Sequence, residues 1–354
     1  MSEGWGVALV GAGQISALYA RAWERIPGAR VRAVASRGLE SAQRLARLCG
    51  APQTCRFEDL DALLADPSID VVCVNSPNRL HAEHALAALH AGKHVIVEKP
   101  LCLTLADADR LVATAARLGR GLAYAENLCF APRYRRARRL VRDGAVGEVL
   151  RAHHSEKHGG PYSPWFWQIE EAGGGALLDL GCHGIECLRW LLGKPPIERV
   201  SATLATTRHG QRTRLEDEAV VRLASAGDVE LVSESSWAIE GPMQSTLELH
   251  GTEDVLELDL MGGRGLRLRS SGRELGGPPG DRLEEEGYPM ELAHFLDRFR
   301  RGEPPEESGR DGRQVLEILL AAYASAGRGA PVELPFDPAG VERPVELWLG
   351  ARES

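Results

Sequence analysis

The chain has 354 residues, of which 44% are hydrophobic and 26% charged, and its formal net charge is −8. A chain of this length and hydrophobic content can bury a substantial core and is more typical of two domains than of one. The negative charge disfavours a non-specific nucleic-acid surface or an anionic-membrane surface, so we expect small-molecule partners, no nucleic acid and no membrane.

The N-terminal residues MSEGWGVALVGAG run directly into a strand-like segment, without the basic and apolar regions of a signal peptide. We therefore expect neither a signal peptide nor a membrane anchor, and a cytoplasmic location. The seven cysteines are scattered, with no C-x-x-C pair to indicate a zinc or redox site. We expect buried thiols, with Cys182 beside His183 as an alternative nucleophile.

The first 125 residues alternate short apolar runs with amphipathic, helix-like stretches. The apolar runs cover 7–10, 31–35, 71–74, 94–97 and 121–124, and the helix-like stretches cover 14–25, 39–48, 79–91 and 104–118. This alternation is typical of parallel βαβ units with helices on both faces of a sheet. The sequence therefore predicts an α/β fold that begins with a Rossmann domain, a doubly wound parallel sheet over residues 1–125.

The pattern changes after residue 126. Helix-like segments at 131–143 and 174–192 are followed by strand-like runs with short breaks: VSATLATT, EAVVRLA, VELVSESSWA, STLELHG and DVLELDL. Because strand follows strand directly, we expect residues 126–354 to form an α+β domain with a large open, mainly antiparallel sheet. Residues 261–288 are expected to be an exposed loop with room for one short strand, and 289–301 and 311–327 to be helices that could pack back on the first domain.

A glycine-rich turn follows the first strand. The sequence VALVGAGQIS places Gly11, Gly13, Gln14 and Ile15 between that strand and a helix, with the small residue Ser16 at the third position of the motif. The first glycine permits a tight turn, and the second lets a pyrophosphate approach the helix N-terminus. This context predicts a dinucleotide site, and the alternative is a tight turn without a ligand.

The residues after the second strand bear on the choice of dinucleotide. A site for NAD usually offers Asp or Glu to the ribose hydroxyls about 20 residues after the glycines, whereas this chain has Ser36 and Arg37. A hydroxyl and a guanidinium suit a 2′-phosphate better than a free diol, so NADP is slightly favoured over NAD. The alternative is that Arg37 is an ordinary solvated charge.

Two further stretches follow in order. NSPNRLHAEHALAALHAGKHVIVEKP ends in Glu98-Lys99-Pro100, and GGGALLDLGCHGIECLRWLLG covers 173–193. With the glycine turn, the whole chain resembles the Gfo/Idh/MocA oxidoreductases. The resemblance implies an NAD(P)-binding Rossmann domain and a larger α/β domain that binds substrate and whose open sheet mediates oligomerisation, so we expect a homodimer or homotetramer.

The resemblance also implies roles for particular residues. The lysine of the E-K-P motif and the D-x-x-x-H pair line the substrate pocket beside the nicotinamide, which gives the catalytic residues Lys99, Asp179 and His183. The cofactor side is expected to include Ser76, Pro77, Asn78, His81, Glu98 and Lys99. Two positions depart from the family pattern, because Tyr19 stands where a His is common and Glu186 where Asp is frequent.

The residue types agree with these roles. On a helix, Asp179 and His183 at i and i+4 share one face, so both can project toward one pocket. Oxidation of a secondary alcohol needs a base for the hydroxyl proton, and His183 titrates in the right range. Lys99 follows a strand at its C-terminal end and could polarise the alcohol oxygen or assist proton transfer. The alternative is a core His183 bonded to Asp179, with Lys99 on the surface.

The segment HHSEKHGGPYSPWFWQ, residues 153–168, is the candidate for substrate contacts. Aromatic side chains could form a stacking wall for a sugar ring and polar ones could bind its hydroxyls, although packing or a subunit contact is as good an explanation. The substrate residues expected are Lys99, Asn127, Lys157, Trp165, Asp179 and His183, with Glu126, Glu156, His158, Phe166 and Trp167 as further candidates. We expect no metal, because His153, His154, Glu156 and His158 alternate along a strand and cannot converge with His183 and Glu186.

The sequence thus predicts an NAD(P)-dependent oxidoreductase that transfers a hydride between nicotinamide and a secondary alcohol or ketone of a sugar, cyclitol or glycoside. The first alternative is a redox-neutral glycoside-cleaving or epimerising enzyme that keeps its nicotinamide bound. The second is a non-catalytic NADP-sensing protein, against which the set of Lys99, Asp179 and His183 argues.

Overall fold

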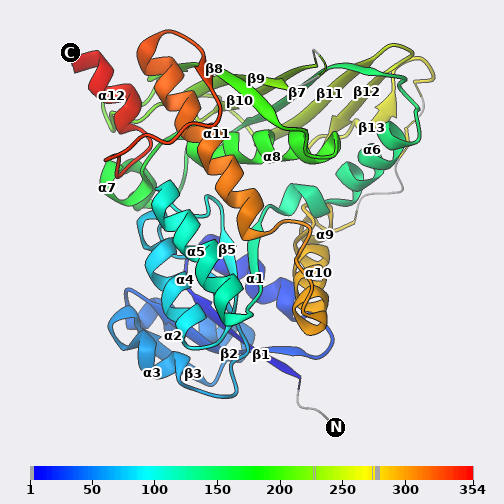
Figure 1. Cartoon of the computed structure of the whole chain (residues 1–354). Helices are drawn as coiled ribbons and strands as arrows, with labels where there is room; N and C mark the ends of the chain where they lie inside the picture. Colours follow the sequence, from blue (N-terminus) through cyan, green and yellow to red (C-terminus); the bar gives the residue numbers. More distant parts are fainter. Residues whose placement is uncertain (1–3, 226, 228, 273, 276–279, 354) are drawn as a thin grey trace. The chain divides into compact units, whose positions relative to one another are not determined.

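The computed structural model describes residues 4–353 apart from 226, 228, 273 and 276–279. The chain divides into two units, one formed by Met1–Asn127 with Gly287–Arg313 and the other by Leu128–Glu286 with Gln314–Ser354. Figure 1 shows the elements of both units. In the part of the chain described, no helix combines the length and the apolar character needed to cross a bilayer.

The first unit is built on a parallel six-stranded sheet with the order β3-β2-β1-β4-β5-β6. The strands are β1 (Trp5–Val10), β2 (Ala29–Ser36), β3 (Gln53–Arg56), β4 (Val71–Val74), β5 (His94–Glu98) and β6 (Leu122–Ala125). Val7, Leu9, Val72 and Ile96 are fully buried, as is typical of a parallel sheet covered on both faces. All six strands are parallel, but β1, β2 and β3 extend the sheet in one direction and β4, β5 and β6 extend it in the other. The crevice between β1 and β4, where the strand order reverses, is where open α/β sheets bind ligands.

The helices of this unit are α1 (Gln14–Trp23), α2 (Leu39–Cys49), α3 (Leu60–Leu64), α4 (His81–His90), α5 (Leu105–Leu118) and α10 (Tyr288–Arg301). Helix α5 begins where the Thr104 hydroxyl accepts a hydrogen bond from the backbone N of Asp107 at 3.1 Å, and it ends at Gly119 in the left-handed conformation. Helix α10 packs against α1, with the rings of Tyr19 and Tyr288 6.0 Å apart.

The second unit is built on an eight-stranded sheet with the order β13-β12-β11-β7-β10-β9-β8-β14. The strands are β7 (Val149–Lys157), β8 (Ile197–Ala205), β9 (Glu218–Ser225), β10 (Glu230–Ser236), β11 (Gln244–Gly251), β12 (Val255–Asp259), β13 (Gly265–Leu268) and β14 (Val332–Glu333). Strands β7 and β10 pair in parallel, while the other pairs of this sheet are antiparallel. The expected fold class, a Rossmann sheet followed by a mainly antiparallel sheet, is confirmed.

The helices of the second unit are α6 (Pro132–Arg142), α7 (Ile169–Ala172), α8 (Cys182–Leu191), α9 (Arg282–Glu285), α11 (Gly309–Arg328, in this unit from Gln314) and α12 (Glu346–Glu353). Helix α8 packs on β7 and β10, and we call that side of the sheet the inner face (Figure 1). Within 261–288, where we expected a loop with room for one short strand, the described residues include the short strand β13 and, in addition, the helix α9. Residues 273 and 276–279 of this stretch lie outside the described residues.

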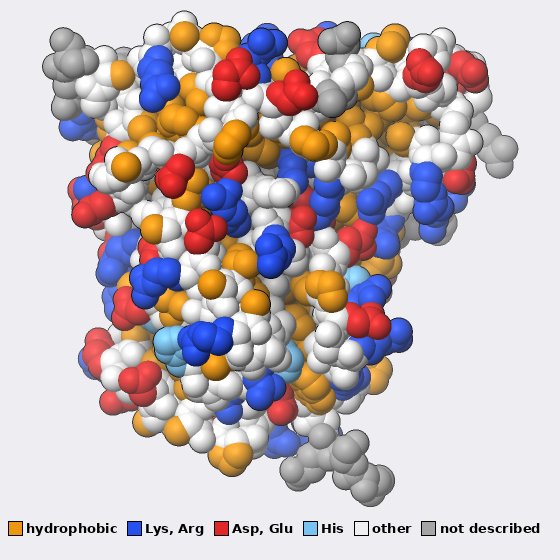
Figure 2. Space-filling view, in the orientation of Figure 1, with side chains coloured by type: hydrophobic (Ala, Val, Ile, Leu, Met, Phe, Trp, Pro, Cys, Tyr) orange, Lys and Arg blue, Asp and Glu red, His pale blue; other side chains and the backbone are white. Residues whose placement is uncertain are grey.

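The opposite side of the sheet, the outer face, is polar. Cross-strand ion pairs join Lys157 to Glu234 at 2.7 Å, Arg269 to Glu257 at 2.7 Å and Arg151 to Glu230 at 3.4 Å. Figure 2 shows basic and acidic side chains interspersed over the visible face of the molecule, without a broad basic region on that face. This distribution agrees with the net negative charge of the chain.

Candidate functional site

The glycine turn lies at the carboxyl end of β1. Gly11 has φ +119° and its backbone N donates to the Ala35 carbonyl at 2.8 Å; a Cβ there would lie 2.2 Å from the carbonyl oxygen of Asn75. A glycine is therefore required at this position. A Cβ at Gly13 would have no atom within 4 Å, and no side chain caps the N-terminus of α1. The turn therefore leaves open space in front of uncapped backbone N–H groups, which is the environment a pyrophosphate needs.

The other residues of the predicted cofactor site follow the neighbouring strands. Gln14 is exposed and Ile15 partly exposed at the start of α1, whereas Ser16 is buried and accepts a hydrogen bond from the Asn75 side chain at 3.3 Å. Ser36 ends β2 as a buried residue, and Arg37 is exposed directly after it. The structure thus places the hydroxyl and the guanidinium at the strand end where the ribose of a dinucleotide is recognised.

Two buried histidines of α4 hold the loop that follows β4 through hydrogen bonds to Ser76. The Nδ1 atom of His81 lies 2.7 Å from the carbonyl oxygen of Pro100, and its Nε2 atom lies 2.8 Å from that of Ser76. The Nδ1 atom of His84 lies 3.0 Å from the Ser76 hydroxyl. Burial lowers the pKa of both imidazoles, that of His84 to about 4. His81 is 1% exposed, so it ties the Ser76 loop to the E-K-P turn, which is an indirect role in the predicted cofactor site.

The E-K-P turn follows β5, between the ends of β4 and β6. Glu98 is buried and its Oε2 atom accepts a hydrogen bond from the backbone N of Lys99 at 3.2 Å, while Lys99 itself is partly exposed. Pro77 precedes the short 3₁₀ turn Asn78–Leu80, and Asn127 begins another, Asn127–Phe130; Asn78 and Asn127 are both buried. These groups follow adjacent parallel strands and therefore line one edge of the sheet.

Asp179 and His183 lie in the second unit on one continuous helical segment. A π-helical turn, Leu177–Gly181, carries Asp179, and α8 follows with His183 in its first turn. Both side chains are buried, with exposed fractions of 8% and 7%. A π turn inside a helix is a recurrent feature of functional sites. Trp237 donates a hydrogen bond to Asp179, with its Nε1 atom 3.0 Å from Asp179 Oδ2, and the Nε2 atom of His158 lies 3.5 Å from the same oxygen.

The three glycines at 173–175 allow the start of this segment to pack closely. A Cβ at Gly174 would lie 2.2 Å from the Tyr323 hydroxyl, and one at Gly175 would lie 1.9 Å from the carbonyl oxygen of Glu216. The Oε1 atom of Glu216 accepts hydrogen bonds from the backbone N of Gly175 at 2.8 Å and of Leu177 at 3.1 Å. The sequence reasoning missed Glu216 and Tyr323, because they are distant in the chain and belong to no motif.

Two more glycines bring the helix down onto the sheet. A Cβ at Gly184 would lie 2.3 Å from the Ser233 hydroxyl and 2.9 Å from His154 Nδ1, and one at Gly181 would lie 3.4 Å from the Ser235 hydroxyl. These three partners lie on the inner face of β7 and β10. The G-C-H-G spacing therefore fixes the height of the helix above the strands, and with it the position of Asp179.

The aromatic residues of 165–167 form a cluster beside Asp179. The rings of Trp165 and Phe166 stack at 3.8 Å, Phe166 meets Trp237 edge-on at 6.4 Å, and Trp167 lies 5.3 Å from Trp237. Trp167 and Trp237 are buried, whereas Trp165 is only partly buried. Trp165 and Phe166, which are both partly exposed, therefore have surface to offer a sugar ring.

Lys157 requires a correction. It points to the outer face of β7, where its Nζ atom lies 2.7 Å from Glu234, while Asp179 lies on the inner face. Side chains alternate along a strand, so the next residue, His158, reaches Asp179 instead. We therefore replace Lys157 by His158 among the candidate site residues.

The same alternation separates the histidines considered as metal ligands. His153 lies on the outer face beside Glu234, 3.4 Å away, and His154 lies on the inner face with its Nε2 atom 3.0 Å from the Tyr134 hydroxyl. Glu186 is fully buried on α8, where it pairs with Arg189 and, at 3.1 Å, with Lys194. Glu186 therefore belongs to an ion-pair network at this end of the second unit's helix α8.

Two further residues singled out in the sequence, Cys182 and Tyr19, are buried. Cys182 is buried and its Sγ atom lies 3.3 Å from the carbonyl oxygen of Asp179, so it packs as a small side chain. Tyr19, where relatives often carry His, is fully buried on α1, and burial followed by the charges of Glu98 and Glu291 raises its pKa.

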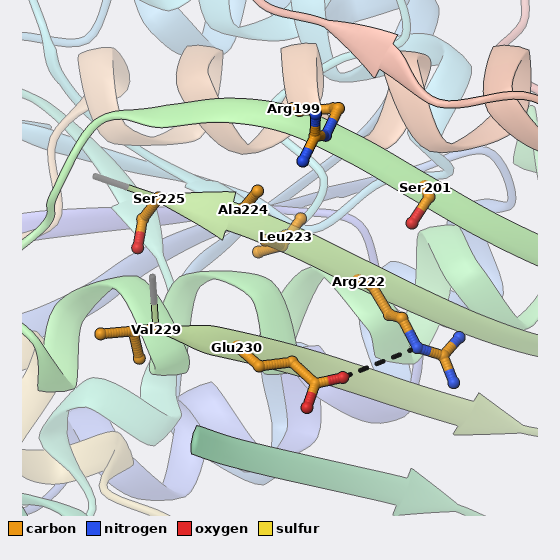
Figure 3. A pocket seen from close by; sticks show the side chains of 8 residues that line it. All are labelled: Arg199, Ser201, Arg222, Leu223, Ala224, Ser225, Val229 and Glu230. Atoms are coloured by element: carbon orange, nitrogen blue, oxygen red, sulfur yellow. Dashed lines mark ion pairs between the residues drawn. The ribbon is translucent and has the colours of Figure 1, made fainter. Parts of the chain in front are cut away.

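A pocket on the outer face is distinct from these residues. It is lined by Arg199, Ser201, Arg222, Leu223, Ala224, Ser225, Val229 and Glu230. Figure 3 shows Arg222 directed toward Glu230, with which it forms an ion pair of 3.8 Å. None of the predicted site residues lines this pocket, so it is not a candidate for the reaction described below.

Both units of the chain contain residues that match models of one protein family. Residues 5–125 match the Gfo/Idh/MocA model described as an oxidoreductase family with an NAD-binding Rossmann fold, and residues 134–257 match the model of the Gfo/Idh/MocA C-terminal domain. The chain is 29% identical over 341 residues to 1,5-anhydro-D-fructose reductase of Ensifer adhaerens, covering 93% of this chain and 98% of that protein.

Two further proteins are similar to the chain. It is 30% identical over 274 residues to 2,7-anhydro-N-acetylneuraminate hydratase of Mediterraneibacter gnavus, covering 76% of this chain and 71% of that protein. The crystal structure of GenD2 from gentamicin A biosynthesis, in complex with NAD, is similar with a TM-score of 0.86 and 33% identity, covering 95% of this chain and 98% of that one.

Proposed function

The chain belongs to the Gfo/Idh/MocA family of oxidoreductases, and we propose that Lys99, Asp179 and His183 carry out its reaction. The enzyme transfers a hydride between a nicotinamide dinucleotide and a secondary alcohol or ketone of a sugar, cyclitol or glycoside. The observation that supports this most strongly is the arrangement of Asp179, whose carboxylate is buried, bonded to an indole and an imidazole, and placed one helical turn before His183. A buried carboxylate next to an imidazole is suited to orienting a hydroxyl and moving its proton.

The dinucleotide would supply the hydride chemistry when it is bound. The open space at Gly13 and the uncapped N-terminus of α1 support the assignment of its pyrophosphate to the turn at Gly11 and Gly13. The side chains of the protein transfer the hydroxyl proton of the substrate and stabilise the charges that form during the reaction. His183 accepts the hydroxyl proton during oxidation and returns it during reduction. Asp179 stabilises the imidazolium that forms or orients the substrate hydroxyl, and the Lys99 ammonium stabilises negative charge on the alcohol oxygen.

For the dinucleotide, we propose a preference for NADP over NAD. Ser36 and Arg37 offer a hydroxyl and an exposed guanidinium at the end of β2, without an acidic side chain at these two positions. A guanidinium pairs with a 2′-phosphate through charge-assisted hydrogen bonds.

For the substrate, we propose a ring with several hydroxyl groups. Trp165 supplies apolar contact area, while Asn127 and Asp179 supply polar groups that can fix the ring orientation. Support comes from the relatives, since 1,5-anhydro-D-fructose reductase is named for a reaction on an anhydrosugar.

A redox-neutral reaction is the second candidate. It is favoured by the similarity to 2,7-anhydro-N-acetylneuraminate hydratase, whose name indicates an overall reaction without net oxidation or reduction of a cofactor. The two candidates differ in one observable: a dehydrogenase changes the nicotinamide absorbance in proportion to the product formed, whereas a redox-neutral enzyme forms product while the absorbance returns to its starting value. A panel of sugars, cyclitols and glycosides, assayed by absorbance and by product analysis with each dinucleotide, tests the proposal. Absence of turnover across the panel, with the dinucleotide bound, would support a sensing protein instead.

For the assembly, we propose a homodimer or homotetramer in which the outer face of the large sheet meets another subunit. Because that face carries cross-strand ion pairs such as Lys157 with Glu234 and Arg269 with Glu257, contacts across it would be largely polar. Such an interface weakens as salt rises. Light scattering at low and high salt measures this: we expect an oligomer that dissociates more readily at high salt, and a monomer at low salt would contradict the proposal.

A further inference from the structure

The ends of β7 and β10 lie next to each other in the second unit. These strands run parallel, with Ser236 opposite Lys157, whereas the flanking pairs of β7 with β11 and of β9 with β10 are antiparallel. Parallel strands deliver the residues that follow them to the same edge of a sheet. The residues that follow are His158 and Trp237, and the backbone N of His158 continues the ladder by donating to the Ser236 carbonyl at 2.9 Å. Both side chains therefore emerge together on the inner face.

Trp237 and His158 converge on one oxygen of Asp179. The indole Nε1 lies 3.0 Å from Asp179 Oδ2, and the imidazole Nε2 lies 3.5 Å from the same atom. An indole nitrogen can only donate a hydrogen bond, so the carboxylate must be the acceptor. The indole N–H of Trp237 therefore points at a buried carboxylate. Hydrogen bonds to charged groups are stronger than those between neutral groups, so this bond contributes strongly to holding the carboxylate.

The loop after β7 sets the proton position on His158. The backbone N of Gly160 donates to His158 Nδ1 at 3.0 Å, so in the neutral imidazole the proton is on Nε2, facing Asp179. Gly160 has φ +104°, a conformation that glycine adopts without strain. The glycine pair after His158 thus selects the tautomer that donates to the carboxylate.

Trp237 is held in place from several sides. It is fully buried, its backbone N donates to the Asp217 carbonyl at 2.7 Å, and its ring packs against Phe166 and Trp167. The indole therefore cannot follow Asp179 if the carboxylate rotates. A carboxylate bonded to a fixed donor loses rotational freedom, which is what precise placement of a reacting group requires.

We propose that Trp237 and His158 are positioning residues, which hold the Asp179 carboxylate in the orientation that serves the substrate hydroxyl and His183. This inference rests on the proposed function. It goes beyond it by assigning roles to two residues outside the E-K-P and D-x-x-x-H motifs and by tying them to the parallel pair of strands.

The test compares variants that remove one donor each. Trp237→Phe keeps a ring and removes the indole N–H, His158→Leu removes the imidazole, and His158→Gln restores an amide N–H near the position of Nε2. Trp190→Phe is the matched control, because Trp190 is a fully buried tryptophan of the same unit that packs under the Arg138 guanidinium, 4.3 Å away. Each variant is assayed for kcat, KM, the dissociation constant of the dinucleotide, the melting temperature and the primary kinetic isotope effect of a substrate deuterated at the carbon that is oxidised.

We expect Trp237→Phe and His158→Leu to lower kcat by roughly 10- to 100-fold, the usual effect of a lost hydrogen bond to a charged group, with little change in dinucleotide affinity. The isotope effect should rise because the chemical step becomes slower relative to the other steps. His158→Gln should recover part of the loss, and Trp190→Phe should retain the wild-type isotope effect. A merely structural role changes the melting temperature or the active fraction and leaves the isotope effect unchanged.

The outcomes separate the inference from the function on which it rests. Normal kcat and isotope effect in both Trp237→Phe and His158→Leu, alongside an inactive Asp179→Asn variant, would overturn the inference and leave the proposed function intact. Near-normal turnover of Asp179→Asn and His183→Asn would overturn the proposed function itself, and the inference with it. If Trp237→Phe does not fold, the comparison of His158→Leu with His158→Gln decides alone: equal losses in the two would contradict a donor role.

Discussion

The hydroxyl of Tyr323, on α11, donates a hydrogen bond of 2.6 Å to Oε1 of Glu216, at the loop before β9. The same carboxyl oxygen accepts the backbone N–H groups of Gly175 and Leu177, which begin the segment that carries Asp179 and His183. One buried side chain thus satisfies three donors at the start of the candidate catalytic helix, where backbone N–H groups otherwise lack partners.

Replacing Glu216 should therefore destabilise the second unit. We expect Glu216→Ala to lower the free energy of unfolding by about 2–4 kcal/mol, because it leaves buried donors without an acceptor. Glu216→Gln keeps an amide oxygen in place of Oε1 and should cost less. Urea unfolding of the two variants and the wild type measures the difference, and equal stability of Glu216→Ala and wild type would show that water replaces the carboxyl.

The carboxyl group of Glu216 also predicts how the stability of the protein changes between weakly acidic and neutral pH. Burial raises the pKa of Glu216 to about 7, although the three hydrogen bonds act in the opposite direction. A group whose pKa is higher in the folded state contributes stability that is complete below its unfolded pKa and is lost as the pH rises through the folded value. The wild type should therefore lose stability relative to Glu216→Gln between about pH 4.5 and pH 7. Parallel curves for the two proteins over this range would contradict the raised pKa.

The buried His84 of the first unit predicts that the protein loses stability as the pH falls. Burial, followed by the charges of His81 and Arg79, lowers the pKa of His84 to about 4. A depressed pKa means that the unfolded chain binds the proton first, so stability is lost as the pH falls from about 6.5 toward 4, by about 1.4 kcal/mol per pH unit for one group. His84→Gln should reduce this slope of unfolding free energy against pH by about one proton, and His90→Gln, an exposed position of the same helix, is the control. An unchanged slope in His84→Gln would show that His84 is charged in the folded protein.

Some of this arrangement could be predicted from residues that are near one another in the chain. The glycine turn, the E-K-P turn and the D-x-x-x-H pair are local motifs, and the runs VALV and VVCV have the continuous apolar character of buried parallel strands. Strand β3 (Gln53–Arg56) was missed, because QTCR is half-exposed and has neither an apolar run nor a clear alternation.

Relationships between distant residues could not be predicted in this way. The parallel pairing of β7 with β10 depends on which strands meet, and no local pattern records it. For the same reason the roles of Trp237, Glu216 and Tyr323 appear only in the folded chain. The strand that contains Lys157 was expected, but the face to which Lys157 points was not. A shift of one residue in the register of a strand moves every side chain to the other face, and the sequence alone does not determine that register.

Cofactor choice is tested by a single charge reversal. Arg37→Asp should weaken NADP binding much more than NAD binding, because a carboxylate repels the 2′-phosphate that the guanidinium would pair. Dissociation constants for both dinucleotides, measured by fluorescence titration, give the ratio. Equal loss of the two affinities, or no loss, would remove Ser36 and Arg37 from this role.

The most direct test of the catalytic account is the turnover of His183→Asn on the substrate identified by the panel. If His183 accepts the hydroxyl proton, turnover should fall by roughly 10²- to 10⁴-fold while dinucleotide affinity stays nearly intact, because the glycine turn belongs to the other unit. A folded His183→Asn variant with near-normal turnover and a lowered melting temperature would contradict the account and make the Asp179–His183 pair a structural feature of the helix.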